Sequence, residues 1–95
     1  MKGDLNKIWG DQNLVEGNIN EINGNTNVVN GNQNIAKSSE STVIGNKNIL
    51  EGDKILISGH ENNVNGQENV VEGNKNNLRG SYNTVSGNIN TVEGN

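Results

Sequence analysis

The sequence has no cysteine, proline or phenylalanine, and it has one tryptophan, one tyrosine and one methionine. Without cysteine, no disulfide can stabilise the fold and no thiolate can act as a nucleophile or a metal ligand. Apolar residues make up only 28% of the 95 residues, which is too little for an ordinary two-layer core at this length. The longest apolar runs, such as Ile55–Ile57, are too short to span a bilayer. These shortages exclude a disulfide scaffold, a thiol enzyme and a helical membrane span.

Positive charge is also scarce. The net charge is −4 and no block of basic residues occurs, so we expect no nucleic-acid surface. The amino-terminal segment Met1–Asp4 lacks the apolar core of a secretory signal. We therefore expect neither a nucleic acid nor a membrane as a partner.

Glycine and asparagine, in contrast, are abundant: 13 Gly and 23 Asn occupy 36 of the 95 positions. Composition alone would suggest a disordered or prion-like tract, but the order of the residues does not. Every glycine lies on a period of seven residues, and the one empty slot is occupied by Ser38. The glycines are at 3, 10, 17, 24, 31, 45, 52, 59, 66, 73, 80, 87 and 94. A disordered chain has no need of such a regular period, so we expect a repeat protein.

Two further positions repeat when each heptad is numbered from its glycine. Position 6 is always apolar, and position 4 is Asn in 11 of 13 heptads, with Ser41 and Ile55 as the exceptions. The position 4 asparagines of alternate heptads form two sets: Asn6, Asn20, Asn34, Asn48, Asn62, Asn76 and Asn90; and Asn13, Asn27, Asn69 and Asn83. The repeating unit is therefore Gly-x-x-Asn-x-φ-x.

This unit is incompatible with a coiled coil, which needs two apolar residues per heptad and would lose about 1 kcal/mol at each glycine. As a strand, positions 4 and 6 point inward and positions 5 and 7 outward. The glycine and the polar residue after it supply a corner. The Asn-Gly pairs at 23–24, 30–31 and 65–66 allow hairpin turns as an alternative. A hairpin meander would not require the same seven-residue period throughout, and we disfavour it.

The predicted fold is an all-β solenoid, a β-roll with two heptads (14 residues) per coil and about 6.5 to 7 coils. Residues 1–95 form a single domain in this prediction, with heptads running from Gly3 to Asn95. Successive coils stack about 4.8 Å apart. Position 6 side chains fill the narrow core, and stacked Asn side chains form hydrogen-bonded ladders along the axis.

Alternate heptads then present two different outer faces. The outward side chains of one face form a stripe of apolar, β-branched and small polar residues, interrupted by Glu16 and Glu72. Its other members are Leu14, Val28, Asn30, Thr42, Ile44, Leu56, Ser58, Val70, Thr84 and Ser86. The outward side chains of the second face are largely polar or charged. They include Lys7, Trp9, Glu21, Lys37, Glu51, Arg79 and Glu93.

The last two heptads, Gly80-Ser-Tyr-Asn-Thr-Val-Ser-Gly-Asn-Ile-Asn-Thr-Val-Glu-Gly94, resemble the repeats of ryegrass-type antifreeze proteins. The similarity extends over nearly the whole chain through the Asn-x-Val-x-Gly period. It implies a left-handed β-roll with a valine core and asparagine ladders, which binds ice through one flat face and inhibits ice recrystallisation. Thr84 with Ser86 matches the outward Thr-x-Ser pair of that family, whereas Glu16 and Glu72 depart from it. The heads of YadA-like trimeric adhesins resemble the chain more weakly, with Ser and Ala in place of Asn and Val.

Two hypotheses about function follow. In the first, the uncharged stripe is an ice-binding face to which many residues contribute. In the second, the same stripe and the unpaired strands at the ends of the rod drive lateral or end-to-end self-assembly into a structural fibre, or serve an adhesin or fibre module. For end-to-end stacking, the partial heptads Met1–Lys2 and Gly94–Asn95 belong to the same face. Either an ice-binding or an adhesive role implies an extracellular location; otherwise localisation is left open.

The irregular middle of the chain offers a more local hypothesis. Ser38, Ser41 and Ile55 break the repeat close to the outward residues Thr42, Ile44 and Leu56. A tolerated drift of the repeat, with Ile55 filling core space, is the simpler interpretation. The alternative is a partner-binding patch around Thr42, Ile44 and Leu56.

We expect no catalytic residues, cofactor or metal. The one histidine, His60, and the aspartates Asp4, Asp11 and Asp53 occupy corner positions, and no group has the spacing of a zinc or calcium site. Trp9 is expected to cover an edge of the first coil. A thin rod also lacks the concave site that enzymes use. We predict a non-catalytic scaffold.

Overall fold

The computed structural model describes residues 5–94. The expected first glycine at Gly3, the partial heptad Met1–Lys2 and the terminal Asn95 lie outside the described residues. Within them the chain forms thirteen short strands and no helix, and each strand contains a position 6 residue as its second residue. The strands are β1 (Lys7–Trp9), β2 (Leu14–Glu16), β3 (Glu21–Asn23), β4 (Val28–Asn30), β5 (Ile35–Ser39), β6 (Thr42–Ile44), β7 (Ile49–Asp53), β8 (Leu56–Ser58), β9 (Asn63–Asn65), β10 (Val70–Glu72), β11 (Asn77–Arg79), β12 (Thr84–Ser86) and β13 (Thr91–Glu93).

Alternate strands belong to two parallel sheets. The odd-numbered strands form a seven-stranded sheet in the order β1-β3-β5-β7-β9-β11-β13, and the even-numbered strands form a six-stranded sheet. Each residue pairs with the residue 14 positions later, as Val29 does with Val43 and Leu50 with Val64. The all-β solenoid with two heptads per coil is confirmed. The hairpin alternative is wrong, because every pairing is parallel.

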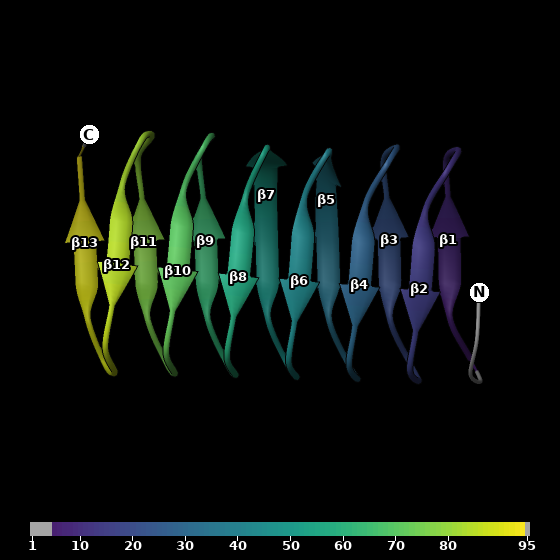
Figure 1. Ribbon diagram of the computed structural model, residues 1–95, viewed down its shortest axis with the longest axis horizontal. Coiled ribbons are helices and arrows are strands. Elements are labelled where there is room, and N and C mark those ends of the chain that lie inside the picture. The colour runs from purple at the N-terminus through teal and green to yellow at the C-terminus, as the bar shows by residue number, and fades with distance from the viewer. Residues whose placement is uncertain (1–4, 95) are drawn as a thin grey trace.

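The coil winds in a left-handed sense. In Figure 1 the chain runs upward in the seven-stranded sheet behind, crosses at the top and runs downward in the six-stranded sheet in front, while it advances from right to left. The rod measures 34 × 21 × 12 Å, so it is a thin slab with two broad faces. The two sheets supply these faces.

The core is one row of position 6 side chains from each sheet. Eleven of these side chains are buried, from Val15 to Val85, and Ile8 and Val92 at the two ends are partly buried. Ile55, which replaces a position 4 asparagine, is also buried and belongs to the same core. Because each coil contributes only two core residues, its apolar surface is covered by the coils before and after it rather than by a second layer.

Glycine occupies the corner because coils stack too closely there for a side chain. Gly45 has φ +130°, and a Cβ added to it would lie 1.7 Å from the carbonyl oxygen of Gly59 in the next coil. Ser38 fills the corresponding slot without a positive φ, since β5 continues through it to Ser39 and pairs with Gly52 and Asp53 of β7. The chain accommodates the missing glycine by extending the strand.

Position 3 has a conformation that the residue types do not suggest. All thirteen position 3 residues have φ between 55° and 62°, including the β-branched Ile19, Thr26 and Ile89. Side chains other than Gly, Asn and Asp rarely adopt this left-handed conformation. The closure of the coil, not local preference, therefore determines the backbone at position 3.

The position 4 asparagines form the two expected ladders. The Asn34 side chain donates through Nδ2 to the Gly45 carbonyl oxygen at 2.9 Å and accepts from the Asn48 backbone N–H at 3.0 Å. The same two bonds recur along the chain, for example from Asn48 Nδ2 to the Gly59 oxygen and from the Asn62 N–H to Asn48 Oδ1. No buried side-chain N or O atom of the described residues lacks a partner. The ladders thus satisfy polar groups that a thin core cannot expose to water.

One ladder is interrupted where the repeat is irregular. Ser41 replaces the asparagine as a hydrogen-bond acceptor, because its Oγ accepts from the Ile55 backbone N–H at 3.0 Å. Ile55 has no polar side-chain atom and is buried instead. The break is confined to one of the two ladders; the other runs unbroken from Asn6 to Asn90.

Candidate functional site

The outer face of the six-stranded sheet carries an aligned row of uncharged side chains at position 5. Parallel pairing places Val28 beside Thr42, Thr42 beside Leu56 and Leu56 beside Val70. Leu14 and Thr84 continue the row at its two ends. Leu14 and Leu56 remain 50% and 43% exposed. This row is a flat strip of methyl and hydroxyl groups that repeats once per coil.

A second row on the same face, at position 7, is more polar. It places Asn30 beside Ile44 and Ile44 beside Ser58, with Glu16 before them and Glu72 after them. The two carboxylates therefore bound a central region without charge, which we call the central patch. The central patch consists of Val28, Asn30, Thr42, Ile44, Leu56, Ser58 and Val70. The expected face residues Leu14, Thr84 and Ser86 lie on the same face but outside the patch, on β2 and β12.

The seven-stranded sheet presents a different surface. Its position 5 row contains Lys7, Glu21, Ile35, Ile49, Asn63, Asn77 and Thr91, and its position 7 row contains Trp9, Asn23, Lys37, Glu51, Asn65, Arg79 and Glu93. Charged side chains interrupt both rows. Trp9 is 54% exposed on β1, where it lies on the broad face of the sheet. The two faces of the slab are therefore chemically distinct.

The ladders hold both faces rigid. Each Asn side chain joins its own strand start to the glycine corner of the next coil, as Asn20 does with Gly31 at 2.8 Å. Each side chain also accepts a hydrogen bond from the backbone N–H of the asparagine in the next coil. One side chain therefore makes two hydrogen bonds to the backbone of the next coil. Outward residues on such strands keep a fixed spacing because their backbones cannot slide independently.

A further ladder, at the corners, was missed by the sequence interpretation. Position 2 side chains accept a hydrogen bond from the backbone N–H of the preceding coil, as Asn32 Oδ1 does from Asn18 at 2.7 Å. His60 takes part through Nδ1, which accepts from the Asn46 N–H at 3.0 Å. The signal in the sequence was that every position 2 residue carries a hydrogen-bond acceptor. Of the predicted corner residues, His60 and Asp53 thus accept hydrogen bonds in this further ladder, and Asp11 donates its backbone N–H to Asn25 Oδ1. Asp4 lies outside the described residues.

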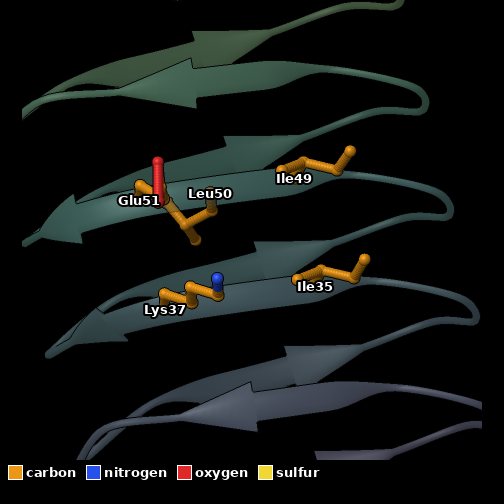
Figure 2. Close-up of a pocket in the computed structure, with 5 residues that line it drawn as sticks. All are labelled: Ile35, Lys37, Ile49, Leu50 and Glu51. Atoms are coloured by element: carbon orange, nitrogen blue, oxygen red, sulfur yellow. The ribbon is translucent and has the colours of Figure 1, made fainter.

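We looked in residues 5–94 for a metal site, a membrane span and a pocket. No group of three or more His, Asp or Glu in this range could hold a metal ion. The part of the chain that the structure describes includes no helix long and apolar enough to cross a membrane. A shallow depression of about 310 Å³ lies on the seven-stranded sheet, lined by Ile35, Lys37, Ile49, Leu50 and Glu51 (Figure 2). What the arrangement offers is two broad, rigid faces.

Comparison with known proteins agrees with this architecture. The family model described as the grass antifreeze β-roll matches residues 1–95, the whole chain. Among curated proteins, no sequence match was found. The antifreeze family binds ice and is not known as catalytic. The two-sheet coil, the apolar core and the asparagine ladders agree with this match, and the chain belongs to the grass antifreeze β-roll family.

Proposed function

We propose that the outer face of the six-stranded sheet is the ice-binding surface and that adsorption through it inhibits ice recrystallisation. The observation that carries the proposal is the uncharged position 5 row, in register over all six strands. Membership of the antifreeze family supports ice as the ligand. The interaction involves no catalytic step, because adsorption to a crystal surface changes no covalent bond.

The physical basis is the sum of many weak contacts. Each coil adds one more pair of outward side chains at a step of about 4.8 Å. Removal of apolar surface from liquid water contributes roughly 25 cal/mol per Å². A face already fixed by hydrogen-bonded ladders loses little conformational entropy when it adsorbs, which is the advantage of a preorganised surface. A regular, rigid strip therefore binds better than the same residues on a flexible loop.

The central patch is the strongest part of the proposed surface. Glu16 and Glu72 carry carboxylates that hold liquid-like hydration shells, and removing that water is costly for a charged group. Between them, β4, β6 and β8 present no charged side chain on this face. We infer that ice contacts are concentrated on the central patch and weaken toward β2 and β12.

Lysine substitutions test the face. Val28→Lys, within the patch, should raise the lowest concentration that inhibits ice recrystallisation by at least about tenfold, since a lost contribution of about 1.4 kcal/mol corresponds to tenfold. Thr84→Lys, at the edge strand, should have a smaller effect in the same direction. Both variants should keep the circular dichroism spectrum of the parent, because both side chains are exposed.

A matched control is available on the other sheet. Asn63→Lys also adds one exposed lysine at position 5, on β9, and should leave recrystallisation inhibition within about twofold of the parent, as expected for a surface substitution away from the binding site. Unchanged activity in Val28→Lys and Thr84→Lys, together with lost activity in Asn63→Lys, would assign ice binding to the seven-stranded sheet.

Self-assembly through the same face is a second candidate function. The observation that favours it is the exposure of bulky apolar side chains around the centre of the six-stranded sheet, where Ile44 and Leu56 are 49% and 43% exposed. Contiguous exposed apolar surface often marks an interaction site. In this role the rods pack laterally, or stack through the strands at their ends into filaments.

Replacing Ile44 and Leu56 together with serine distinguishes the two roles. If assembly is the function, electron micrographs of the parent show filaments of uniform width and the double variant shows none. If ice binding is the function, the parent forms no filaments, and the double variant weakens recrystallisation inhibition without a change in particle size. Filaments in both proteins would exclude this patch as the contact.

A further inference from the structure

The outer face of the seven-stranded sheet is self-complementary. We propose that two copies of this chain form a dimer through these faces, with the rods antiparallel and a two-fold axis between β5 and β7. The inference concerns the sheet that the proposed ice surface does not use, and it stands whether or not the protein binds ice.

The centre of the proposed interface is the shallow depression between β5 and β7. Figure 2 shows Ile35 and Ile49 together toward one end of the two strands and Lys37 and Glu51 toward the other. The register pairs Ile35 with Ile49 and Lys37 with Glu51. Ile35 and Ile49 are 37% and 42% exposed on a largely polar face. One apolar pair and one pair of opposite charges thus lie side by side.

A two-fold axis that runs parallel to the strands between β5 and β7 exchanges these residues. Ile35 then faces Ile49 of the second copy, and Lys37 faces Glu51 of the second copy. The four charged groups form an arrangement in which each has an opposite charge both beside it and across from it. Such complementary charges favour one mutual orientation of the two faces and disfavour orientations that bring like charges together.

The complementarity extends along the rod. The same rotation exchanges β3 with β9 and β1 with β11, so Trp9 faces Arg79 of the second copy, a pairing of aromatic ring and guanidinium that is favourable in proteins. None of the facing pairs has charges of the same sign. The remaining facing pairs are Lys7 with Asn77, Glu21 with Asn63, and Asn23 with Asn65.

Three other positions of the axis are less favourable. An axis on β7 would place Glu51 opposite Glu51, and an axis on β5 would place Lys37 opposite Lys37. Moving it to lie between β7 and β9 would bring Lys37 opposite Arg79. Like charges directly opposite each other disfavour these alternatives. Of these four axis positions, only the one between β5 and β7 brings no like charges together.

The size of the face suits a reversible dimer. The slab is 34 Å by 21 Å and six of its seven strands face the second copy, so about 600 Å² per copy is covered, somewhat less than the roughly 800 Å² per partner of a standard stable interface. We expect dissociation in the micromolar range. The two six-stranded sheets remain exposed on opposite sides of the dimer.

Charge reversal tests the geometry by analytical ultracentrifugation. Lys37→Glu places two carboxylates opposite each other, and Glu51→Lys places two ammonium groups opposite each other. Each single variant should raise the dimer dissociation constant at least about a hundredfold. An equimolar mixture of the two variants should dimerise again, because every lysine then faces a glutamate across the axis. The double variant K37E/E51K should also dimerise.

Glu93→Lys is the matched control, since it reverses a charge at the same heptad position on β13, which has no facing strand in this register. It should dimerise like the parent. A parent that is monomeric at all concentrations would overturn the proposal, as would single variants that still dimerise. Monomeric single variants whose mixture stays monomeric would also overturn the two-fold register, provided circular dichroism shows that each is folded.

Discussion

Replacing Gly45 with alanine is expected to destabilise the protein by about 4 kcal/mol or more. Single substitutions cause losses of this size only when they disrupt the core or strain the backbone severely. Two effects add. The φ of +130° is unfavourable for any residue with a Cβ, and that Cβ would lie 1.7 Å from the carbonyl oxygen of Gly59. The obstacle is backbone of the next coil, which cannot move without breaking its own ladder. Since domains are stable by only about 5–15 kcal/mol, thermal unfolding should show a large fall in Tm.

Gly87→Ala separates the two effects. Gly87 lies on the same corner row, 42 residues later, with a similar φ of +125°, but its added Cβ would meet only Asn90 Nδ2, at 3.2 Å. It should therefore lose only the backbone contribution, about 1–3 kcal/mol. Equal losses in the two variants would show that stacking contact between coils does not explain the glycine at this corner.

Replacing Asn34 with alanine is expected to cost about 2–5 kcal/mol. The side chain is fully buried, and its loss removes the donor to the Gly45 oxygen and the acceptor of the Asn48 N–H. The buried Asn48 N–H and the half-buried Gly45 oxygen then lose their partners, at about 1–3 kcal/mol each. Chemical denaturation followed by circular dichroism measures the loss.

Asn30→Ala provides the comparison for this ladder position. Asn30 is the same residue type on β4, but its side chain points outward into solvent. Its replacement should change the free energy of unfolding by less than about 0.5 kcal/mol. If Asn34→Ala were as mild as Asn30→Ala, the ladder would contribute to geometry but not to stability.

Much of the fold was predictable because the corners, the ladders and the core all repeat with the same period of seven residues. Glycine at position 1, asparagine at position 4 and an apolar residue at position 6 each have one structural role. The alternation of side chains along a strand then assigns the outward positions. Thr42 and Leu56 could be placed side by side from their spacing of 14 alone, and the register confirms it.

Other features depend on closure of the coil and not on residue preference. Ile19 and Ile89 carry a left-handed φ that their branched side chains disfavour, so no local signal could predict it. At Ser38 the sequence indicates a missing glycine but not that β5 would lengthen to Ser39. The residues of the proposed site could be listed from their outward positions, whereas the contacts they make with ice depend on the order of water outside the chain.

The assignment of odd and even heptads to opposite sheets has a consequence for how such a chain can grow. Inserting one heptad would keep every glycine on its seven-residue period, yet all later heptads would exchange sheets. Charged residues such as Lys37 or Glu51 would then enter the outer face of the six-stranded sheet, and the matched charges of the other face would separate. Inserting 14 residues lengthens both faces and mixes neither. The heptad is therefore the unit of folding, whereas the unit that gene duplication can add without damage is the pair.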